Sequence, residues 1–398
     1  MIPFASRIDS MAETAAIVGG LFKSMTDPSI ISFGGGAPAA EALPTELIGQ
    51  LCQKIFAPGG RGVEALQYGP VPGVADLRRA VAEQLLRPKG VECDPANILI
   101  VSGGLEGIYL TCQAFINPGD VILVESPTFV HTVEIFDMVQ AKCVAVQTDD
   151  DGLNMEALEA AIREHHPKMI YTIPTFQNPS GRTLSLEKRE RVARLAEEYD
   201  VLVLEDDPYR DIRYSGEDLP PIKVFDKTDH VILANSFSKI FSPGSRLGYV
   251  LASPDVIEKL THVKSATNSH TSMLPQLLAA EFFNGGYYPA HHERICGIYR
   301  ERRDVMLAAI DRCFPEGTKH TMPDGGLFTW AELPPGIDTT ALLPKAVENH
   351  VAYVAGEGFF VERDGRGKNC MRLSFGANTP ERIEEGIARL GALLKSAL

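Results

Sequence analysis

The sequence predicts an α/β protein with a mostly parallel central sheet, followed by a smaller α+β unit. Short apolar runs recur through the first 285 residues, and some segments between them have helical periodicity, as in Leu186–Tyr199. Strands that are apolar on both faces and alternate with helices are typical of parallel sheets covered on both sides. After about residue 290, helices and strands are segregated instead, which indicates an α+β unit.

Each expected strand of the large sheet is an apolar run bounded by turn residues or acids. These runs are Asn97–Val101, Val121–Glu125, Lys168–Ile173, Val201–Glu205, Val231–Asn235 and Leu247–Ala252. In the tail we expect helices at Glu293–Arg312 and Pro380–Leu394, and strands at Leu327–Glu332, Val351–Val354 and Met371–Ser374. The expected division is an N-terminal segment (1–46) that packs with the small domain, a large domain (47–285) and a small domain (286–398).

Composition excludes several classes of protein. The 398 residues carry 38 basic and 52 acidic side chains, a net charge of −14 that disfavours nucleic-acid binding. The seven cysteines are scattered without a C-x-x-C pair, as in a reduced cytoplasmic chain without zinc. No secretory signal or long apolar run is present, so we expect no membrane segment. His291-His292-Glu293 resembles part of a metal motif but lacks a pair of histidines four positions apart, so we expect no metal.

The strongest candidate site follows the run Val231–Asn235. Ligands of parallel α/β sheets bind at the carboxyl ends of strands, where this run is followed by Ser236, Ser238, Lys239 and Arg246. Two hydroxyls and a guanidinium suit a phosphate monoester. A desolvated lysine near another cation has a lowered pKa, as Schiff-base chemistry requires. The alternative is a surface lysine in a loop.

Weaker signals follow the other runs. Gly104 opens a helix whose backbone N–H groups could bind an anion. The acids 205–207, followed by Tyr209, could meet a cation or lie in an exposed turn. Asn178 could donate its amide or form a plain Asn-Pro turn, and Phe129 could stack on a planar ring or belong to the core. Together these groups are what a pyridoxal 5′-phosphate (PLP) site needs.

Several motifs carry a family resemblance. They are Ser236-x-Ser238-Lys239, Pro243-Gly244-x-Arg246-x-Gly248-Tyr249, Asn178-Pro179-Ser180-Gly181, Asp206-x-x-Tyr209, Pro323-Asp324-Gly325-Gly326-Leu327-Phe328-x-Trp330 and Met371-Arg372-Leu373-Ser374-Phe375. Over roughly residues 30–395 the chain resembles the fold-type I PLP enzymes of the class I/II aminotransferase group. The resemblance implies a seven-stranded sheet in the large domain. The segment 31–38 looks nearest to the 2-aminoadipate/kynurenine-type and the broad-specificity aromatic or branched-chain aminotransferases.

The resemblance also implies roles for residues around the cofactor ring. Lys239 would hold PLP as a Schiff base and then act as general base and acid. Asp206 would pair with the ring nitrogen and keep it protonated. Asn178 and Tyr209 would hydrogen-bond the phenolic oxygen of the ring, and Asn178 would also face the substrate. Phe129 would stack on the ring, where many relatives have tyrosine.

Further roles concern the phosphate, the substrate and the partner subunit. The implied phosphate ligands are the backbone amides of Gly104 and Leu105 together with Ser236, Ser238 and Arg246. Gly104 stands where many relatives have serine, so backbone contacts must suffice there. Tyr68 would reach the phosphate in a neighbouring subunit, which implies a homodimer with shared sites. Arg372 would clamp the substrate carboxylate in a bidentate pair, with Gly36 close to the same carboxylate.

The predicted activity is transfer of the amino group of an α-amino acid to a 2-oxo acid, expected to be 2-oxoglutarate by resemblance. Relatives that prefer acidic side chains often use an arginine in the N-terminal helix, and residues 16–21 contain none. We therefore expect an apolar, aromatic or aliphatic amino donor. Lyase, decarboxylase or synthase chemistry on the same fold is the alternative, because the same lysine and acid serve those reactions.

Two further alternatives come from other classes. Gly34-x-Gly36-x-x-Ala39 superficially resembles a dinucleotide-binding fingerprint, but Pro38 and Pro44 oppose a following helix. Some transcription factors carry this fold behind a winged-helix domain. Here Gly34 falls near the start of the sequence, so we expect no such domain.

Overall fold

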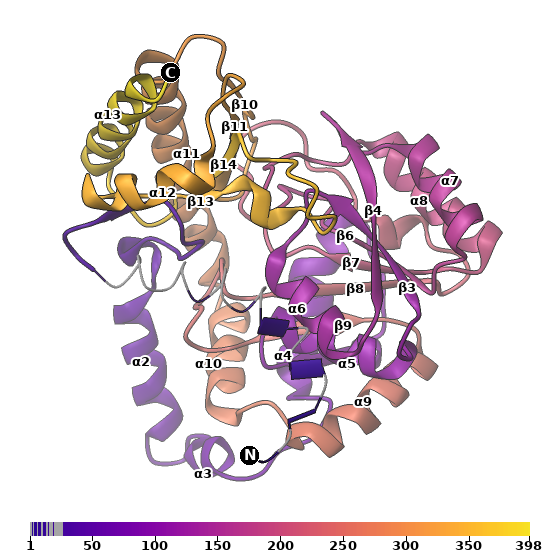
Figure 1. The fold of residues 1–398 in the computed structure, drawn as a ribbon. Coiled ribbons are helices and arrows are strands. Elements are labelled where there is room, and N and C mark those ends of the chain that lie inside the picture. The colour runs from indigo at the N-terminus through magenta and orange to yellow at the C-terminus, as the bar shows by residue number, and fades with distance from the viewer. Residues whose placement is uncertain are drawn as a thin grey trace.

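The computed structural model describes residues 27–398 and, before them, residues 2, 4, 5, 7, 8, 11, 12, 15 and 19. The stretch 16–21, on which the expected donor preference depends, lies outside the described residues except for Gly19. Figure 1 shows a large sheet flanked by helices, with the C-terminal elements, in orange and yellow, gathered above it.

The large sheet is α/β and mostly parallel, as the sequence predicts. Its order is β2 (Ile98–Val101), β9 (Gly248–Leu251), β8 (Val231–Ser236), β7 (Leu202–Asp206), β6 (Met169–Thr172), β3 (Val121–Ser126), β4 (Lys142–Asp149) and β5 (Gly152–Leu153). Strand β9 runs antiparallel to β2 and β8, and β5 is a two-residue hairpin strand on β4. The seven longer strands make up the expected sheet, although β4 was not predicted.

Two hydrophobic cores cover the two faces of this sheet. One core packs α5 (Gly104–Phe115) and α6 (Val130–Met138) on one face. The other packs α7 (Met155–His165) and α8 (Leu186–Tyr199) on the opposite face. Helix α8 has the predicted bounds. The carboxyl ends of the central strands therefore lie between helical layers, where side chains are withdrawn from water.

The C-terminal elements form a second sheet with the order β10 (Lys319–His320), β11 (Phe328–Glu332), β14 (Cys370–Ser374) and β13 (Val354–Ala355). Helices α11 (Tyr288–Cys313) and α13 (Pro380–Ser396) pack side by side against it (Figure 1). The predicted strand 351–354 is divided in two. Its first half, β12 (Val351–Ala352), pairs in parallel with β1 (Ile31–Ser32).

The remaining helices connect and cover these sheets. They are α2 (Thr45–Phe56), α3 (Gly62–Leu66), α4 (Ala75–Ala80), α9 (Pro254–Asn268), α10 (Met273–Asn284), α12 (Thr339–Glu348) and the short turns η1 (Ala40–Ala42), η2 (Val81–Leu86), η3 (Arg87–Lys89), η4 (Pro95–Asn97), η5 (Ile222–Phe225) and η6 (Gly356–Phe359). In the described part of the chain, no helix is long and apolar enough to cross a bilayer. The domain limits at 46/47 and 285/286 stay a prediction.

Candidate active site

Lys239 lies just beyond the end of β8, as the sequence predicts. Its side chain is partly buried, and Nζ donates a hydrogen bond to the Gly36 carbonyl at 2.7 Å. Burial lowers the pKa of Lys239 to about 8, and the positive charges of Arg246 and Arg372 act in the same direction. A larger fraction of this amine is therefore uncharged near neutral pH than for an ordinary lysine, which is what a nucleophilic lysine needs.

The three consecutive acids after β7 have different partners. Glu205 accepts hydrogen bonds from the first two backbone N–H groups of η5, at 2.8 and 2.9 Å. Asp207 forms an ion pair with the buried Arg210 at 2.8 Å. Asp206 is 4% exposed and accepts a hydrogen bond from another buried side chain rather than from a cation. Of the three acids, Asp206 alone is left to meet a cationic group of a ligand.

Burial raises the pKa of Asp206 to about 7. A hydrogen bond from the Tyr171 hydroxyl opposes this increase, and the charge of Asp207 adds to it. A cation placed beside Asp206 would stabilise the ionised carboxylate. The protonated nitrogen of a pyridine ring is such a cation, so the chemistry of this carboxyl fits the predicted cofactor.

A polar cradle is formed where three segments meet. Helix α5 begins at Gly104, and its first N–H groups have no partner within the helix. The hydroxyl oxygens of Ser236 and Ser238 lie 2.8 Å apart. A Cβ built on Gly103 would lie 2.4 Å from the Arg246 guanidinium, so that guanidinium packs directly over the start of the helix. Two hydroxyls, a helix N-terminus and an arginine suit a phosphate dianion.

Two further predicted cofactor contacts, Leu105 and Phe129, lie at the starts of helices α5 and α6. Leu105 is the second residue of α5, so its N–H also belongs to the unpaired first turn. Phe129 lies at the start of α6, directly after the β3 strand end. Its ring meets His131 edge-on, with centroids 5.3 Å apart.

Arg372 is buried on β14 and is only 5% exposed. It donates to the Asn178 Oδ1 atom at 2.7 Å and to the Gly34 carbonyl, while its guanidinium lies over the rings of Phe328 and Phe359 at 4.4 and 5.1 Å. Its Nε atom has no hydrogen-bond partner among the described residues. Burial lowers the pKa of Arg372 to about 10, so it remains a cation at neutral pH and can bind an anion.

Tyr209 connects the lysine and arginine regions. Burial raises its pKa above the usual range, and a hydrogen bond with the Asn178 side chain opposes that increase. The Phe328 ring meets Tyr209 edge-on at 5.6 Å, and Lys239 Nζ lies 5.9 Å from the Tyr209 ring centroid. A Cβ on Gly36 would lie 2.7 Å from the Phe328 ring, so a larger residue would displace that ring.

Tyr68 is the predicted site residue that stays outside this cluster. Its side chain is 86% exposed, and its ring meets His270 edge-on with centroids 5.8 Å apart. Within one chain it is therefore a surface residue, free to meet a second subunit.

Sequence reasoning missed several residues that support the site. Gln177 donates to the Pro127 carbonyl at 2.8 Å and to Glu125 at 3.4 Å, and it accepts the Ser180 N–H and hydroxyl at 2.8 and 2.6 Å. It thereby ties the loop containing Phe129 to the loop that contains Asn178. The signal for Gln177 and Glu125 in the sequence was that both are polar residues at or just beyond the ends of buried strands. No local pattern pointed to Phe359.

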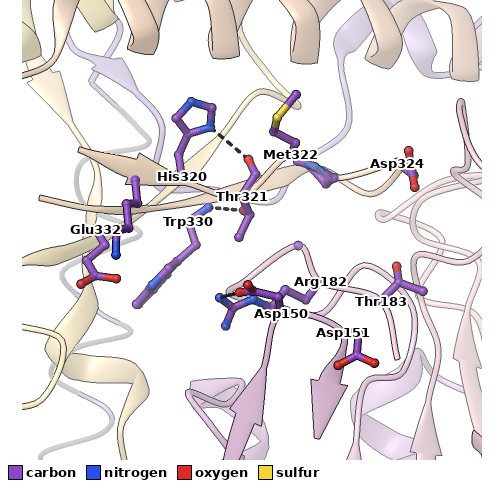
Figure 2. A pocket seen from close by; sticks show the side chains of 13 residues that line it. Asp150, Asp151, Arg182, Thr183, His320, Thr321, Met322, Asp324, Trp330 and Glu332 are labelled. Atoms are coloured by element: carbon purple, nitrogen blue, oxygen red, sulfur yellow. Dashed lines mark hydrogen bonds and ion pairs between the residues drawn. The ribbon is translucent and has the colours of Figure 1, made fainter. Parts of the chain in front are cut away.

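A cleft of about 620 Å³ lies between the β4–β5 hairpin and the β10–β11 strands (Figure 2). None of the predicted site residues lines it. Its Arg182 is paired with Asp150 at 2.7 Å. The groups gathered around Lys239 are instead the candidate functional site. Within the described residues, no cluster of histidine, cysteine or acidic side chains could hold a metal ion.

The Lys239 region has the features of a PLP enzyme of fold type I. A lysine with a lowered pKa, a buried acid for a ring nitrogen and a phosphate cradle lie beside a buried arginine with an unpartnered Nε atom. These groups fit the cofactor in chemistry and charge.

Comparison with known proteins identifies the family. Residues 42–390 match the family model for aminotransferase class I and II. The chain is 40% identical to aromatic-amino-acid aminotransferase 1 of Thermococcus litoralis, over 95% of this chain and 91% of that protein. It is 35% identical to the 2-aminoadipate transaminase of Thermus thermophilus, over 96% and 95%. A solved structure of Pyrococcus horikoshii kynurenine aminotransferase, in complex with PMP, superposes with a TM-score of 0.92 at 36% identity, over 99% of this chain and 97% of that one.

The chain therefore belongs to the class I and II aminotransferases. It is a PLP-dependent aminotransferase.

Proposed function

We propose that Lys239, Asp206, Asn178, Tyr209 and Arg372 carry out transfer of the amino group of an apolar, aromatic or aliphatic α-amino acid to 2-oxoglutarate. One observation carries this assignment. Lys239 Nζ and the Arg372 guanidinium donate to two carbonyls of one short loop, at Gly36 and Gly34. An α-amino acid places its amine and its carboxylate on the same carbon, so one substrate can replace both contacts.

The residues divide the chemical work. When bound, PLP supplies an electron sink for negative charge at the substrate Cα. Asp206 holds the proton on the ring nitrogen, and Arg372 orients the carboxylate through two N–H groups. With the cofactor bound, Lys239 Nζ would accept the proton from the substrate Cα as general base and later donate it as general acid. The rings of Phe328 and Phe359 cover the arginine and exclude water from its anion.

The cofactor contacts proposed for the remaining residues rest on the family resemblance. Phe129 covers the ring. The phosphate is held by the N–H groups of Gly104 and Leu105, by Ser236, Ser238 and Arg246, and by Tyr68 of the neighbouring subunit.

The decisive experiment is the absorption spectrum of the purified protein, before and after amino acids are added without any oxo acid. We expect the visible band of the lysine-bound cofactor to be replaced by the near-ultraviolet band of the amino form. A band that never converts, with ammonia or carbon dioxide released, would indicate a lyase or decarboxylase instead. If no band forms even with added PLP, or if a Lys239→Ala variant retains it, the assignment of Lys239 is wrong.

Apolar side chains around the Arg372 guanidinium support the proposed preference for an apolar amino donor. Phe328, Phe359 and Trp330 are clustered there, and Trp330 and Phe359 meet edge-on with centroids 5.7 Å apart. The similarity to the aromatic-amino-acid enzyme supports the same preference, whereas the 2-aminoadipate relative supports an acidic donor. Initial rates with leucine, phenylalanine and 2-aminoadipate distinguish the two. A clear advantage for 2-aminoadipate would contradict an apolar donor.

The proposed assembly is a cytoplasmic homodimer with shared sites. Tyr68, Leu66 and Val63 are 86%, 78% and 84% exposed, an unusual grouping of large apolar side chains on one segment. The seven free cysteines agree with a reducing compartment. Sedimentation of the holoenzyme gives the oligomeric state, and an active monomer would contradict the shared site.

A further inference from the structure

Tyr171 lies directly beneath the candidate acid of the cofactor site. Strands β6 and β7 are parallel, and their register pairs Tyr171 with Leu204. Side chains two residues apart on a strand share a face, so Asp206 lies on the same face as Leu204 and Tyr171. Tyr171 is fully buried, and the ring of Phe136 on α6 meets it edge-on with centroids 5.5 Å apart. Its ring therefore has little freedom to turn.

The hydroxyl of Tyr171 joins two elements by hydrogen bonds. It donates to Asp206 Oδ2 at 2.8 Å, and it lies 2.9 Å from the Thr132 hydroxyl on α6. A phenol has one proton to donate, so the Thr132 hydroxyl donates to the phenol oxygen. Thr132 thus directs the phenol proton toward the carboxylate. Burial raises the pKa of Tyr171 well above its ordinary value, which keeps that proton in place.

This arrangement leaves one oxygen of Asp206 for a ligand. Oδ2 accepts from Tyr171, whereas Oδ1 has no side-chain partner among the described residues. The neighbouring acid Asp207 disfavours a charge on Asp206. A donor at Oδ2 offsets that repulsion and the cost of burial.

We propose that Tyr171 is a positioning residue, with Thr132, that holds Asp206 as a carboxylate whose free oxygen faces the cofactor's ring nitrogen. The inference rests on the proposed PLP site, and it adds residues that do not themselves touch the cofactor. Tyr171 would act through one atom of the cofactor, because Asp206 would meet the cofactor at the ring nitrogen alone.

Replacing the cofactor's ring nitrogen tests this directly. The variant is Tyr171→Phe, and the ligands are PLP and its carbocyclic analogue with C–H in place of the ring nitrogen. Reconstitution of apoenzyme, followed by absorbance, gives the dissociation constant of each. We expect the variant to bind PLP roughly 10- to 100-fold more weakly, as for loss of a hydrogen bond to a charged group. The analogue should bind wild type and variant equally.

Tyr353→Phe is the matched control. Tyr353 is also buried, and the substitution removes one hydrogen bond, from its hydroxyl to the Thr339 carbonyl at 2.6 Å, in this variant. It should bind both ligands like wild type. In an Asp206→Asn background, Tyr171→Phe should cause no further loss of PLP affinity, because the charge on which the phenol acts is gone.

Equal losses for PLP and the analogue, or no loss for either, would overturn the proposal. If Tyr171→Phe does not fold, Thr132→Val decides, since it removes the hydroxyl that directs the phenol proton. It should weaken PLP alone, and unchanged PLP affinity would overturn the proposal. Failure of wild type to bind PLP would instead refute the proposed function.

Discussion

Arg372 on the C-terminal sheet donates a hydrogen bond to Asn178 in the loop after β6, at 2.7 Å, although 194 positions separate them in the chain. The amide oxygen of Asn178 accepts this bond, and its NH₂ group, which also hydrogen-bonds Tyr209, has a second N–H for a ligand. The proposed carboxylate clamp, Arg372, and the proposed contact to the phenolic oxygen, Asn178, are thereby held as one unit. A substitution at Arg372 should therefore affect substrate binding through geometry as well as charge.

Arg372→Lys should lower kcat/KM for phenylalanine roughly 100-fold, mainly through KM. Lysine retains the charge but loses the planar pair of N–H groups, the stacking on both rings and the bond to Asn178. Steady-state kinetics measure this loss. Arg303→Lys is the control, because Arg303 also stacks on a tyrosine ring, at 4.9 Å, but is not among the proposed site residues. Similar losses in both variants would contradict the clamp.

The lowered pKa of Lys239 predicts a pH dependence. Below about pH 8 the amine is mostly protonated and cannot attack a carbonyl, so the rate of pyridoxal attachment to apoenzyme should rise with pH and level off above about 8. Arg246→Ala removes one of the two cations that lower the pKa of Lys239, so the inflection should move to higher pH. Pyridoxal is used because it has no phosphate group, so loss of the proposed Arg246–phosphate contact does not affect the measured rate.

Arg246→Lys is the control for that shift, since it retains the charge and should leave the inflection near the wild-type position. An Arg246→Ala profile that coincides with wild type would show that burial and Arg372 alone lower the pKa.

Asp206→Asn should abolish most activity while stabilising the apoenzyme at alkaline pH. The pKa of Asp206 is raised from 3.8 to about 7, so the folded state binds a proton more tightly than the unfolded state. Its stability therefore falls as pH rises from about 4 to 7, and the cost is fully present above 7. The apoenzyme of the variant should show a higher Tm than wild type at pH 8, and the difference should vanish near pH 4.

Asp207→Asn should lower the stability of the apoenzyme, whereas Asp206→Asn should raise it. Asp207 is paired with the buried Arg210, so its removal leaves a buried cation unpaired and should cost about 3–5 kcal/mol of stability. Calorimetry of both apoenzymes from pH 4 to 8 checks the contrast. If the two variants had the same Tm profile, the distinct partners of the neighbouring acids would have no energetic consequence.

Gly103→Ala should weaken PLP binding beyond its effect on stability. Gly103 has φ of 94°, and an added Cβ would lie 2.4 Å from the Arg246 guanidinium. Gly119 has nearly the same φ, 91°, with no atom within 4 Å of its Cβ position. Both alanine variants should lose about 1–3 kcal/mol to backbone strain. Only Gly103→Ala should also raise the PLP dissociation constant, and equal constants would exclude a role for this contact in the cradle.

Much of the fold follows from local patterns. The helix Leu186–Tyr199 has the predicted bounds, because its apolar spacing is regular and left-handed Asp200 ends it. Strand β4 (Lys142–Asp149) was missed since it mixes polar and apolar residues, and one of its neighbours is only a two-residue strand. The helix expected at 293–312 covers Tyr288–Cys313. Its start was predicted too late because its first turn lacks the charged residues that marked the rest of the helix.

By itself the sequence determined the family and the order of polar groups at the strand ends, and it predicted a candidate cofactor lysine, because these are short motifs whose residues are neighbours in the chain. It could not determine which partner each polar group meets. That Asp207 pairs with Arg210 while Asp206 meets Tyr171, and that Phe359 covers Arg372, was decided by tertiary structure. Those contacts depend on strand register and on the packing of one sheet against another. Such long-range geometry leaves no local pattern in the chain.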